Sequence, residues 1–298
     1  MDLRKRQWVG GLILVAVFSA MFAAVAGEVE NQGRAILEKN QKAVVTVQLV
    51  IKQKMSMGPM GSRDDESKTE ATGFVVDPSG LTVLALSETD PSGLYENMLS
   101  GMGRGAENFK MESSVSDVKL LLDDGKEIPA QVVLRDKDLD LAFVRPTEKP
   151  ATPMAALDLT QAGQPEMLDQ VVALNRLGKV ANRAYSANLE RIQAVVLRPR
   201  KFYVPGNDPT HTGLGSPVFT LDGKLVGMVA LRTTKGEGKG GLMSAMGGFA
   251  DSMMPVVVPV ADILEAAKQA PAEAPKEAPK EAPEENKTES APEPAPKS

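Results

Sequence analysis

The sequence predicts an all-β fold, in which many short strands form a barrel or a sandwich. Between residues 28 and 269, short segments rich in Val, Leu and Ile recur along the chain. Hairpin-type turn sequences separate several of them, at Asp77–Gly80, Asp123–Gly125 and Leu221–Gly223. Only residues 30–41 and 260–268 have a helical pattern, so alternating βαβ units are not expected.

The individual strands follow from the positions of these apolar segments. The expected strands cover residues 43–51, 72–76, 81–86, 118–122, 130–134, 139–144, 170–174, 192–197, 216–220, 225–231 and 255–260. Three longer segments, 55–68, 92–114 and 233–254, are rich in Gly, Met and polar residues. This composition is typical of surface loops, so we expect long loops at these three places.

Composition excludes several classes of function. The formal net charge of -5 argues against a general affinity for nucleic acid, which requires a basic surface. The chain contains no cysteine, so disulfides, thiolate metal sites and cysteine nucleophiles are excluded. The sequence also has no phosphate-binding glycine loop and no His/Cys/carboxylate set at metal-binding spacing, so no cofactor is expected.

Both ends of the chain differ from the part between them. Arg4, Lys5 and Arg6 precede an apolar run over residues 8–26 that ends in Ala-Val-Ala, which is typical of a signal peptide over residues 1–26. The run is also long enough to be retained as a membrane anchor. We therefore expect a periplasmic or secreted protein of a bacterial envelope, with a folded domain over residues 28–269. Residues 270–298 consist of Glu-Ala-Pro-Lys units, which predict an extended tail.

Six segments, in this order, resemble those of the trypsin-like serine proteases, particularly the bacterial HtrA type. They are Thr72–Leu81, Val118–Ala130, Asp136–Val144, Asp169–Gly178, Ser216–Gly227 and Val256–Val260. The resemblance covers roughly residues 43–268. It implies two six-stranded barrels, over about 43–150 and 160–262, with a cleft between them. No segment remains for a PDZ domain of the kind that many HtrA-type proteins carry.

The resemblance also assigns the three catalytic positions. It places the orienting carboxylate at Asp140. The family's histidine falls seven residues after the turn glycine, Gly80, and therefore at Ser87. The Gly-x-Ser-Gly-Gly motif falls on Thr212–Ser216, which puts Leu214 at the position of the nucleophile. Because both the base and the nucleophile depart from the family pattern, we interpret the chain as a pseudoprotease.

An active serine endopeptidase is the main alternative. A shift of two residues in the alignment would make Ser216 the nucleophile, but it would still need a base. The only histidine, His211, lies beside the nucleophile loop instead of on the first barrel. The sequence places no lysine near Ser87 or Leu214, so a serine–lysine dyad is not indicated either. Asp140 could equally be an aspartate with a purely structural role.

The methionines allow a further alternative, which is copper binding. They fall into three groups: Met55, Met57 and Met60; Met98, Met102 and Met111; Met243, Met246, Met253 and Met254. Thioethers bind Cu(I), and exposed Met-rich surfaces also bind peptides or simply pack on the protein. The expected partner is a peptide or protein, held in the cleft or by these segments. Contact with a membrane is expected only if residues 8–26 are retained.

Overall fold

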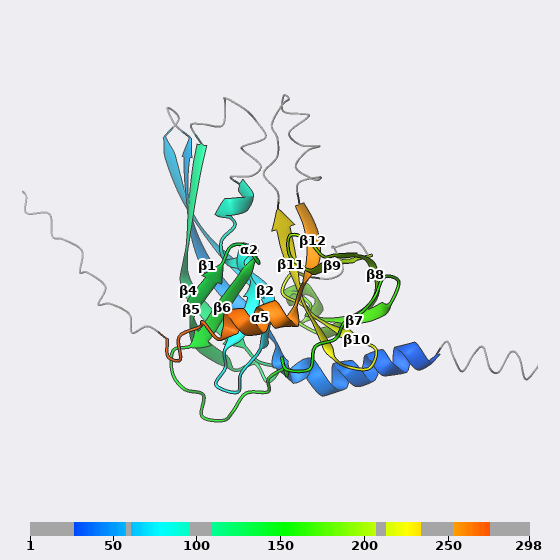
Figure 1. Ribbon diagram of the computed structural model, residues 1–298. Coiled ribbons are helices and arrows are strands. Elements are labelled where there is room, and N and C mark those ends of the chain that lie inside the picture. Colours follow the sequence, from blue (N-terminus) through cyan, green and yellow to red (C-terminus); the bar gives the residue numbers. More distant parts are fainter. Residues whose placement is uncertain (1–26, 58–60, 96–108, 207–212, 234–252, 275–298) are drawn as a thin grey trace, which may run out of the picture.

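The computed structural model describes residues 27–57, 61–95, 109–206, 213–233 and 253–274 (Figure 1). The expected signal peptide, most of the C-terminal tail and His211 lie outside these ranges. Within them, no helix combines the length and the apolar character needed to span a bilayer.

The strands form two closed antiparallel barrels of six strands each. The first barrel has the order β1-β2-β3-β6-β5-β4 and contains β1 (Val44–Met57), β2 (Ser62–Val75), β3 (Thr82–Ala85), β4 (Phe109–Leu121), β5 (Glu127–Asp136) and β6 (Leu141–Pro146). The second has the order β10-β11-β12-β9-β8-β7 and contains β7 (Gln170–Arg176), β8 (Tyr185–Val196), β9 (Phe202–Pro205), β10 (Pro217–Thr220), β11 (Leu225–Thr233) and β12 (Met253–Pro259). The predicted double-barrel fold is confirmed.

Alternation along the strands divides the apolar side chains among three cores. One cluster draws only on the first barrel and on α2, and includes Val47, Leu49 and Leu120. Another draws on all six strands of the second barrel. A third cluster joins the two barrels with both terminal helices. In β10, Val218 belongs to the core of the second barrel, whereas Phe219 belongs to the shared cluster. Successive strand residues point to opposite faces, so one strand contributes to two cores.

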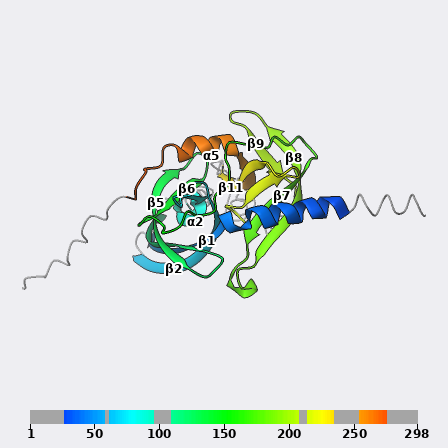
Figure 2. The same cartoon turned by 90° about the horizontal axis from the view of Figure 1, so that it is seen from below.

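Both predicted helices are present. The first covers residues 27–40 and leads through a short 3-10 helix, η1 (Gln41–Ala43), into β1. It runs along the underside of the second barrel, where Gly33 lies beside Val172 (Figure 2). The second, α5 (Val260–Ala267), buries Val260, Ile263 and Ala266. The apolar faces of both helices pack against the outside of the barrels, and the burial of these faces holds the helices in place.

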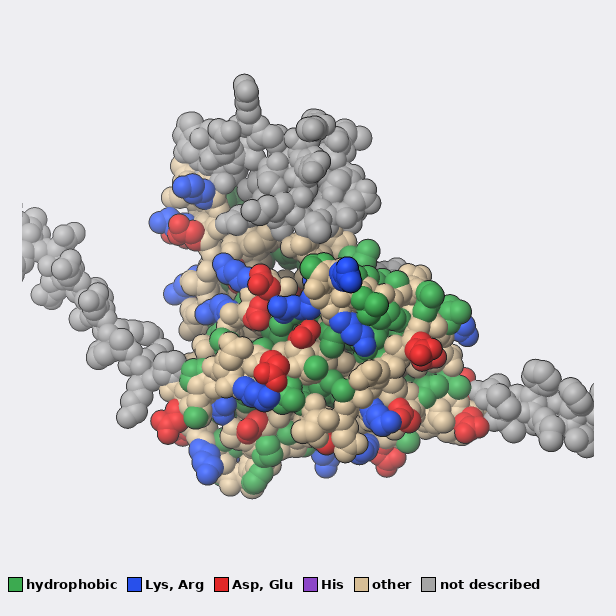
Figure 3. All heavy atoms as spheres, viewed as in Figure 1, with side chains coloured by type: hydrophobic (Ala, Val, Ile, Leu, Met, Phe, Trp, Pro, Cys, Tyr) green, Lys and Arg blue, Asp and Glu red, His purple; other side chains and the backbone are tan. Residues whose placement is uncertain are grey.

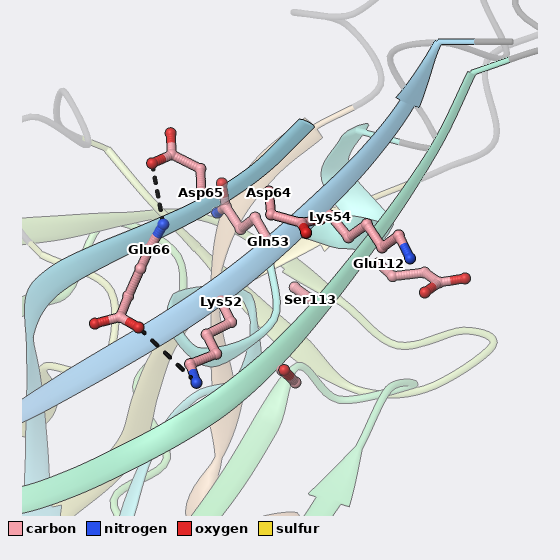
Figure 4. A pocket seen from close by; sticks show the side chains of 9 residues that line it. Lys52, Gln53, Lys54, Asp64, Asp65, Glu66, Glu112 and Ser113 are labelled. Carbon is pink, nitrogen blue, oxygen red and sulfur yellow. Dashed lines mark hydrogen bonds and ion pairs between the residues drawn. The ribbon is translucent and has the colours of Figure 1, made fainter. Parts of the chain in front are cut away.

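The predicted long loops over residues 55–68 and 92–114 are wrong in part. Residues 62–68 belong to β2 and residues 109–114 to β4. Together with the end of β1 they form a three-stranded extension of the first barrel. In this extension Lys52 lies opposite Glu66, with a 4.0 Å ion pair, and Lys54 lies opposite Asp64 (Figure 4). These polar strands lack the apolar alternation of half-buried strands, so their sequence resembles a loop. Backbone pairing and opposite charges stabilise them instead.

Candidate active-site cleft

A cavity of about 400 Å³ lies where the two barrels meet. Its lining comes from the first barrel, from α2 (Leu86–Thr89) with the residues that follow it, and from β11 of the second barrel. The lining residues are Leu86, Ser87, Asp90, Ser92, Gly93, Leu94, Lys137, Asp140, Leu231 and Thr233. The predicted positions Ser87 and Asp140 therefore share one cavity.

Asp140 is at the centre of a hydrogen-bond network that joins the two barrels. The residue immediately precedes β6, has a φ of +55° and is 9% exposed. Its Oδ1 accepts a 2.7 Å bond from the amide of Ser87. Its Oδ2 accepts a 3.1 Å bond from the Ser87 hydroxyl and a 2.7 Å bond from the amide of Leu231. The first two donors belong to the first barrel and the third to β11 of the second, so this carboxylate links both.

Burial controls the electrostatics of the site. Desolvation raises the pKa of Asp140 to about 6, although three hydrogen-bond donors act in the opposite direction. The neighbouring Glu88 also has a raised pKa, because it is buried and because the negative charge of Asp140 is close. The Ser87 hydroxyl donates to Asp140. The resemblance assigns the position of Ser87 to the family's histidine, but a serine hydroxyl does not take up a proton at neutral pH.

Leu214 and Gly215 lie in the contact between the barrels. Leu214 is partly buried against the shared cluster and the core of the second barrel. Gly215 has a φ of +84°, and a Cβ atom there would lie 1.9 Å from the carbonyl oxygen of Thr72 on β2. The same Cβ would lie 3.7 Å from the amide nitrogen of Ala85 on β3. Only glycine fits this approach, which holds the Leu214 loop against the first barrel.

Ser216, the alternative nucleophile, is fully buried, with an exposed fraction of 0%. Within the described part of the chain its Oγ has no hydrogen-bond partner. Its amide donates to the carbonyl of Gly213 at 3.2 Å, and its carbonyl accepts from the amide of Val229 at 2.9 Å. A substrate carbonyl could reach this oxygen only if the surrounding chain moved.

Asp90 is a site residue that the sequence analysis missed. Its Oδ1 accepts hydrogen bonds from the amide of Ser92 and from the hydroxyls of Ser92 and Ser113. Burial disfavours the charged form of Asp90, but the bonds from Ser113 and Ser92 outweigh this effect and lower its pKa. These bonds join the segment after α2 to β4. The Asp-Pro-Ser sequence at residues 90–92 is typical of a turn and could have indicated part of this arrangement.

Two polar contacts outside the cavity also connect the barrels. Thr72 on β2 donates to the side chain of Asn175 on β7. Glu70 on β2 accepts two bonds from the guanidinium of Arg183, at 2.8 and 3.0 Å. The hydrogen bond from Arg183 lowers the pKa of Glu70. Arg183 lies between β7 and β8, so this bidentate pair links the first barrel to the second.

The methionine groups are only partly described. Met60, Met98, Met102, Met243 and Met246 lie outside the described residues, so copper binding stays a prediction. Met55 on β1 and Met111 on β4 are opposite one another in the register, and Met253 and Met254 lie on β12. In the part of the chain that the structure describes, no group of three His, Cys, Asp or Glu residues is arranged to hold a metal ion.

Comparison with known families matches residues 71–228 to the trypsin-like peptidase domain. This range runs from β2 into β11, and it contains Ser87, Asp140 and Leu214. A search of curated proteins gives no matching relative. The match spans more than half of the 298 residues, in a chain that folds into two six-stranded barrels. The protein therefore belongs to the family of trypsin-like peptidase domains.

Proposed function

We propose that this protein is an exported pseudoprotease, which binds a peptide or protein in the bacterial cell envelope without cleaving it. The observation that carries the proposal is the pairing of Ser87 with Asp140. The carboxylate that would orient a histidine accepts both the amide and the hydroxyl of a serine instead.

The chemistry of acyl transfer supports this proposal. A serine peptidase needs a base that removes the proton of the attacking hydroxyl, and a hydroxyl that reaches the substrate. The resemblance assigns these roles to Ser87 and Leu214, and neither side chain can perform its role. Ser216 carries a hydroxyl, but its complete burial and the lack of a neighbouring base among the described residues argue against nucleophilic attack.

The cleft itself has the features of a binding site. The cavity of about 400 Å³ is large enough for one or more side chains of a peptide. Its lining combines apolar groups, such as Leu94 and Leu231, with polar groups, such as Ser92 and Lys137. The signal-peptide pattern of residues 1–26 supports the location in the envelope.

Digestion of casein tests the absence of peptidase activity. Wild-type protein and the Ser216→Ala variant are incubated with casein, and the products are analysed by mass spectrometry beside an active trypsin. We expect intact casein with both proteins, as in a blank without enzyme. Fragments that appear with the wild type and disappear with Ser216→Ala would instead support an active serine endopeptidase.

A further inference from the structure

A second hollow adjoins the cavity on the side of the second barrel. It is lined by side chains that include Asp138, Arg200, Lys201, Phe202, Leu231 and Arg232. Leu231 also lines the cavity at Asp140, and Lys137 of that cavity is the neighbour of Asp138 in the chain. The two hollows therefore meet at Leu231, and the second is a shallow depression of about 20 Å³. We call the depression around Arg200, Lys201 and Arg232 the cationic groove.

Aromatic rings position two of these cations. The guanidinium of Arg232 on β11 lies 4.8 Å from the ring centre of Phe202, and the Lys201 ammonium lies 5.0 Å from that of Tyr203. Stacking on a ring face leaves the N–H groups at the edge of a guanidinium available for a ligand. In Figure 3, Lys and Arg side chains lie beside both hydrophobic and acidic side chains over the strands above α5.

The cations in the cleft differ from other surface cations of the described residues, because they form no close ion pair. Among the described residues, Lys137, Arg200, Lys201 and Arg232 form no ion pair, whereas Lys119, Lys224 and Lys268 each pair with a carboxylate elsewhere on the surface.

The acids of the cleft are mostly engaged already. Asp90 and Asp140 each accept three hydrogen bonds from the protein. Asp138 lines the cationic groove but forms no ion pair with a described residue, and Asp262 interacts with Arg200 only at longer range. Among the described residues, the four cations thus have acidic neighbours only at longer range, such as Asp90 for Lys137 and Asp262 for Arg200.

We propose that the cationic groove recognises an acidic segment of the bound peptide, whose neighbouring side chains enter the cavity at Asp140. This inference rests on the proposed peptide-binding function. Its basis is charge complementarity, since these cations gather on a protein whose net charge is -5. Phe202 and Leu231, which are only partly buried, also line the groove, and such an apolar lining beside the cavity fits peptide side chains better than an isolated inorganic anion.

Fluorescence anisotropy with labelled peptides tests this proposal. The full-length protein is titrated against hexaglutamate, hexaglutamine and hexalysine at fixed ionic strength. We expect saturable binding of hexaglutamate, and binding at least about tenfold weaker for the other two peptides. Arg200→Gln should weaken the binding of hexaglutamate by about tenfold, and Arg232→Gln by a similar factor. Asp138→Asn removes a negative charge from the groove and should strengthen it.

Lys224→Gln is the matched control, because it removes the same charge from a turn outside the cleft. It should leave the binding of hexaglutamate unchanged. Arg232→Gln removes the stacking on the Phe202 ring and could disturb β9. Arg200 is exposed, so Arg200→Gln should fold normally and tests the proposal independently. Equal losses for Arg200→Gln and Lys224→Gln would overturn the proposal, as would equal binding of hexaglutamine.

Two further outcomes separate this proposal from others. Vesicles that contain phosphatidylglycerol provide a membrane surface. Binding of these vesicles but not of hexaglutamate would overturn the proposal in favour of a lipid surface. Binding of hexaglutamine as strong as that of hexaglutamate would overturn the role of the cationic groove in recognising an acidic segment. It would leave the proposed peptide-binding function intact. Cleavage of casein would overturn the proposed function whatever the anisotropy shows.

Discussion

The hydroxyl of Ser87 donates a hydrogen bond to Oδ2 of Asp140 at 3.1 Å, while the amide of the same serine donates to Oδ1 at 2.7 Å. One residue therefore occupies both oxygens of the carboxylate, and the amide of Leu231 adds a donor from the other barrel. In an active triad one of these oxygens holds the catalytic imidazole. In this protein the Asp140 carboxylate links the two barrels.

The buried charge of Asp140 should make the stability depend on pH. Its pKa is raised from 3.8 to about 6 in the folded protein, so the folded state binds more protons between these values. The contribution of Asp140 to stability is thus largest below pH 4 and decreases as the pH rises to 6. We expect the unfolding free energy of the wild type, relative to Asp140→Asn, to fall by about 2 kcal/mol between pH 4 and pH 6.

Urea unfolding of both proteins at several pH values measures this difference. The comparison cancels groups that the two proteins share, although the variant also removes the effect of the Asp140 charge on Glu88. A difference that stays constant or increases from pH 4 to pH 6 would show that the charged form of Asp140 carries no burial cost.

Ser216→Ala should leave the stability unchanged or increase it by about 1 kcal/mol. The Oγ of Ser216 is buried and, among the described residues, has no partner, so its removal eliminates a desolvated polar group without breaking a bond. The urea midpoint at constant slope provides the measurement. A loss of more than about 1 kcal/mol would mean that the hydroxyl makes a favourable interaction in the folded protein.

Gly215→Ala should destabilise the protein by at least about 3 kcal/mol. The new Cβ would overlap the carbonyl of Thr72, which belongs to a backbone strand and cannot move aside easily. Gly125→Ala is the matched control, since Gly125 has a similar φ of +81° but no atom within 4 Å of its Cβ position. The control should cost only about 1 to 2 kcal/mol for the left-handed conformation. Thermal or urea unfolding that gives equal losses would contradict a close contact between the barrels at Gly215.

The Glu70–Arg183 pair should contribute more to stability than an exposed pair in the same sheet. Glu70→Gln breaks a bidentate, partly buried contact between the barrels, whereas Glu66→Gln affects only the exposed pair with Lys52. We expect Glu70→Gln to lower the urea midpoint clearly and Glu66→Gln to change it little. The pKa of Glu70 is lowered, so its contribution should disappear as the pH falls below 4.5. Equal effects of the two variants at neutral pH would contradict this role.

The barrels could be predicted from the sequence because half-buried strands leave a pattern of apolar residues. All six segments of the resemblance fall on strands or turns of the two barrels, and α5 begins at Val260 as expected. The three-stranded extension left no such pattern. Residues 62–66 are exposed and pair with the end of β1, and the other side of β1 pairs with β4, which is distant in the sequence. A segment of charged residues and serines cannot be distinguished from a loop when its strand pairing is unknown.

The candidate site could be predicted only where family spacing applies. Counting from Gly80 located Ser87, and the structure brings it to Asp140. The Asp90 to Ser113 bond and the Glu70 to Arg183 pair join residues that are 23 and 113 positions apart. Such contacts depend on the closure of the barrels and on their relative position, and no local pattern encodes them. No local pattern could indicate the cationic groove either, because its cations come from β11 and from the segment before β9.

Labelling with a fluorophosphonate probe, read by intact-mass analysis, tests the proposed loss of the catalytic machinery most directly. The probe forms a covalent adduct with a serine whose hydroxyl is activated by a base. Wild-type protein at neutral pH should keep its unmodified mass under conditions that label an active trypsin to completion. A single saturable adduct on Ser216 or Ser87, abolished by alanine at that position, would show an activated hydroxyl and contradict the assignment of this trypsin-like domain as a pseudoprotease.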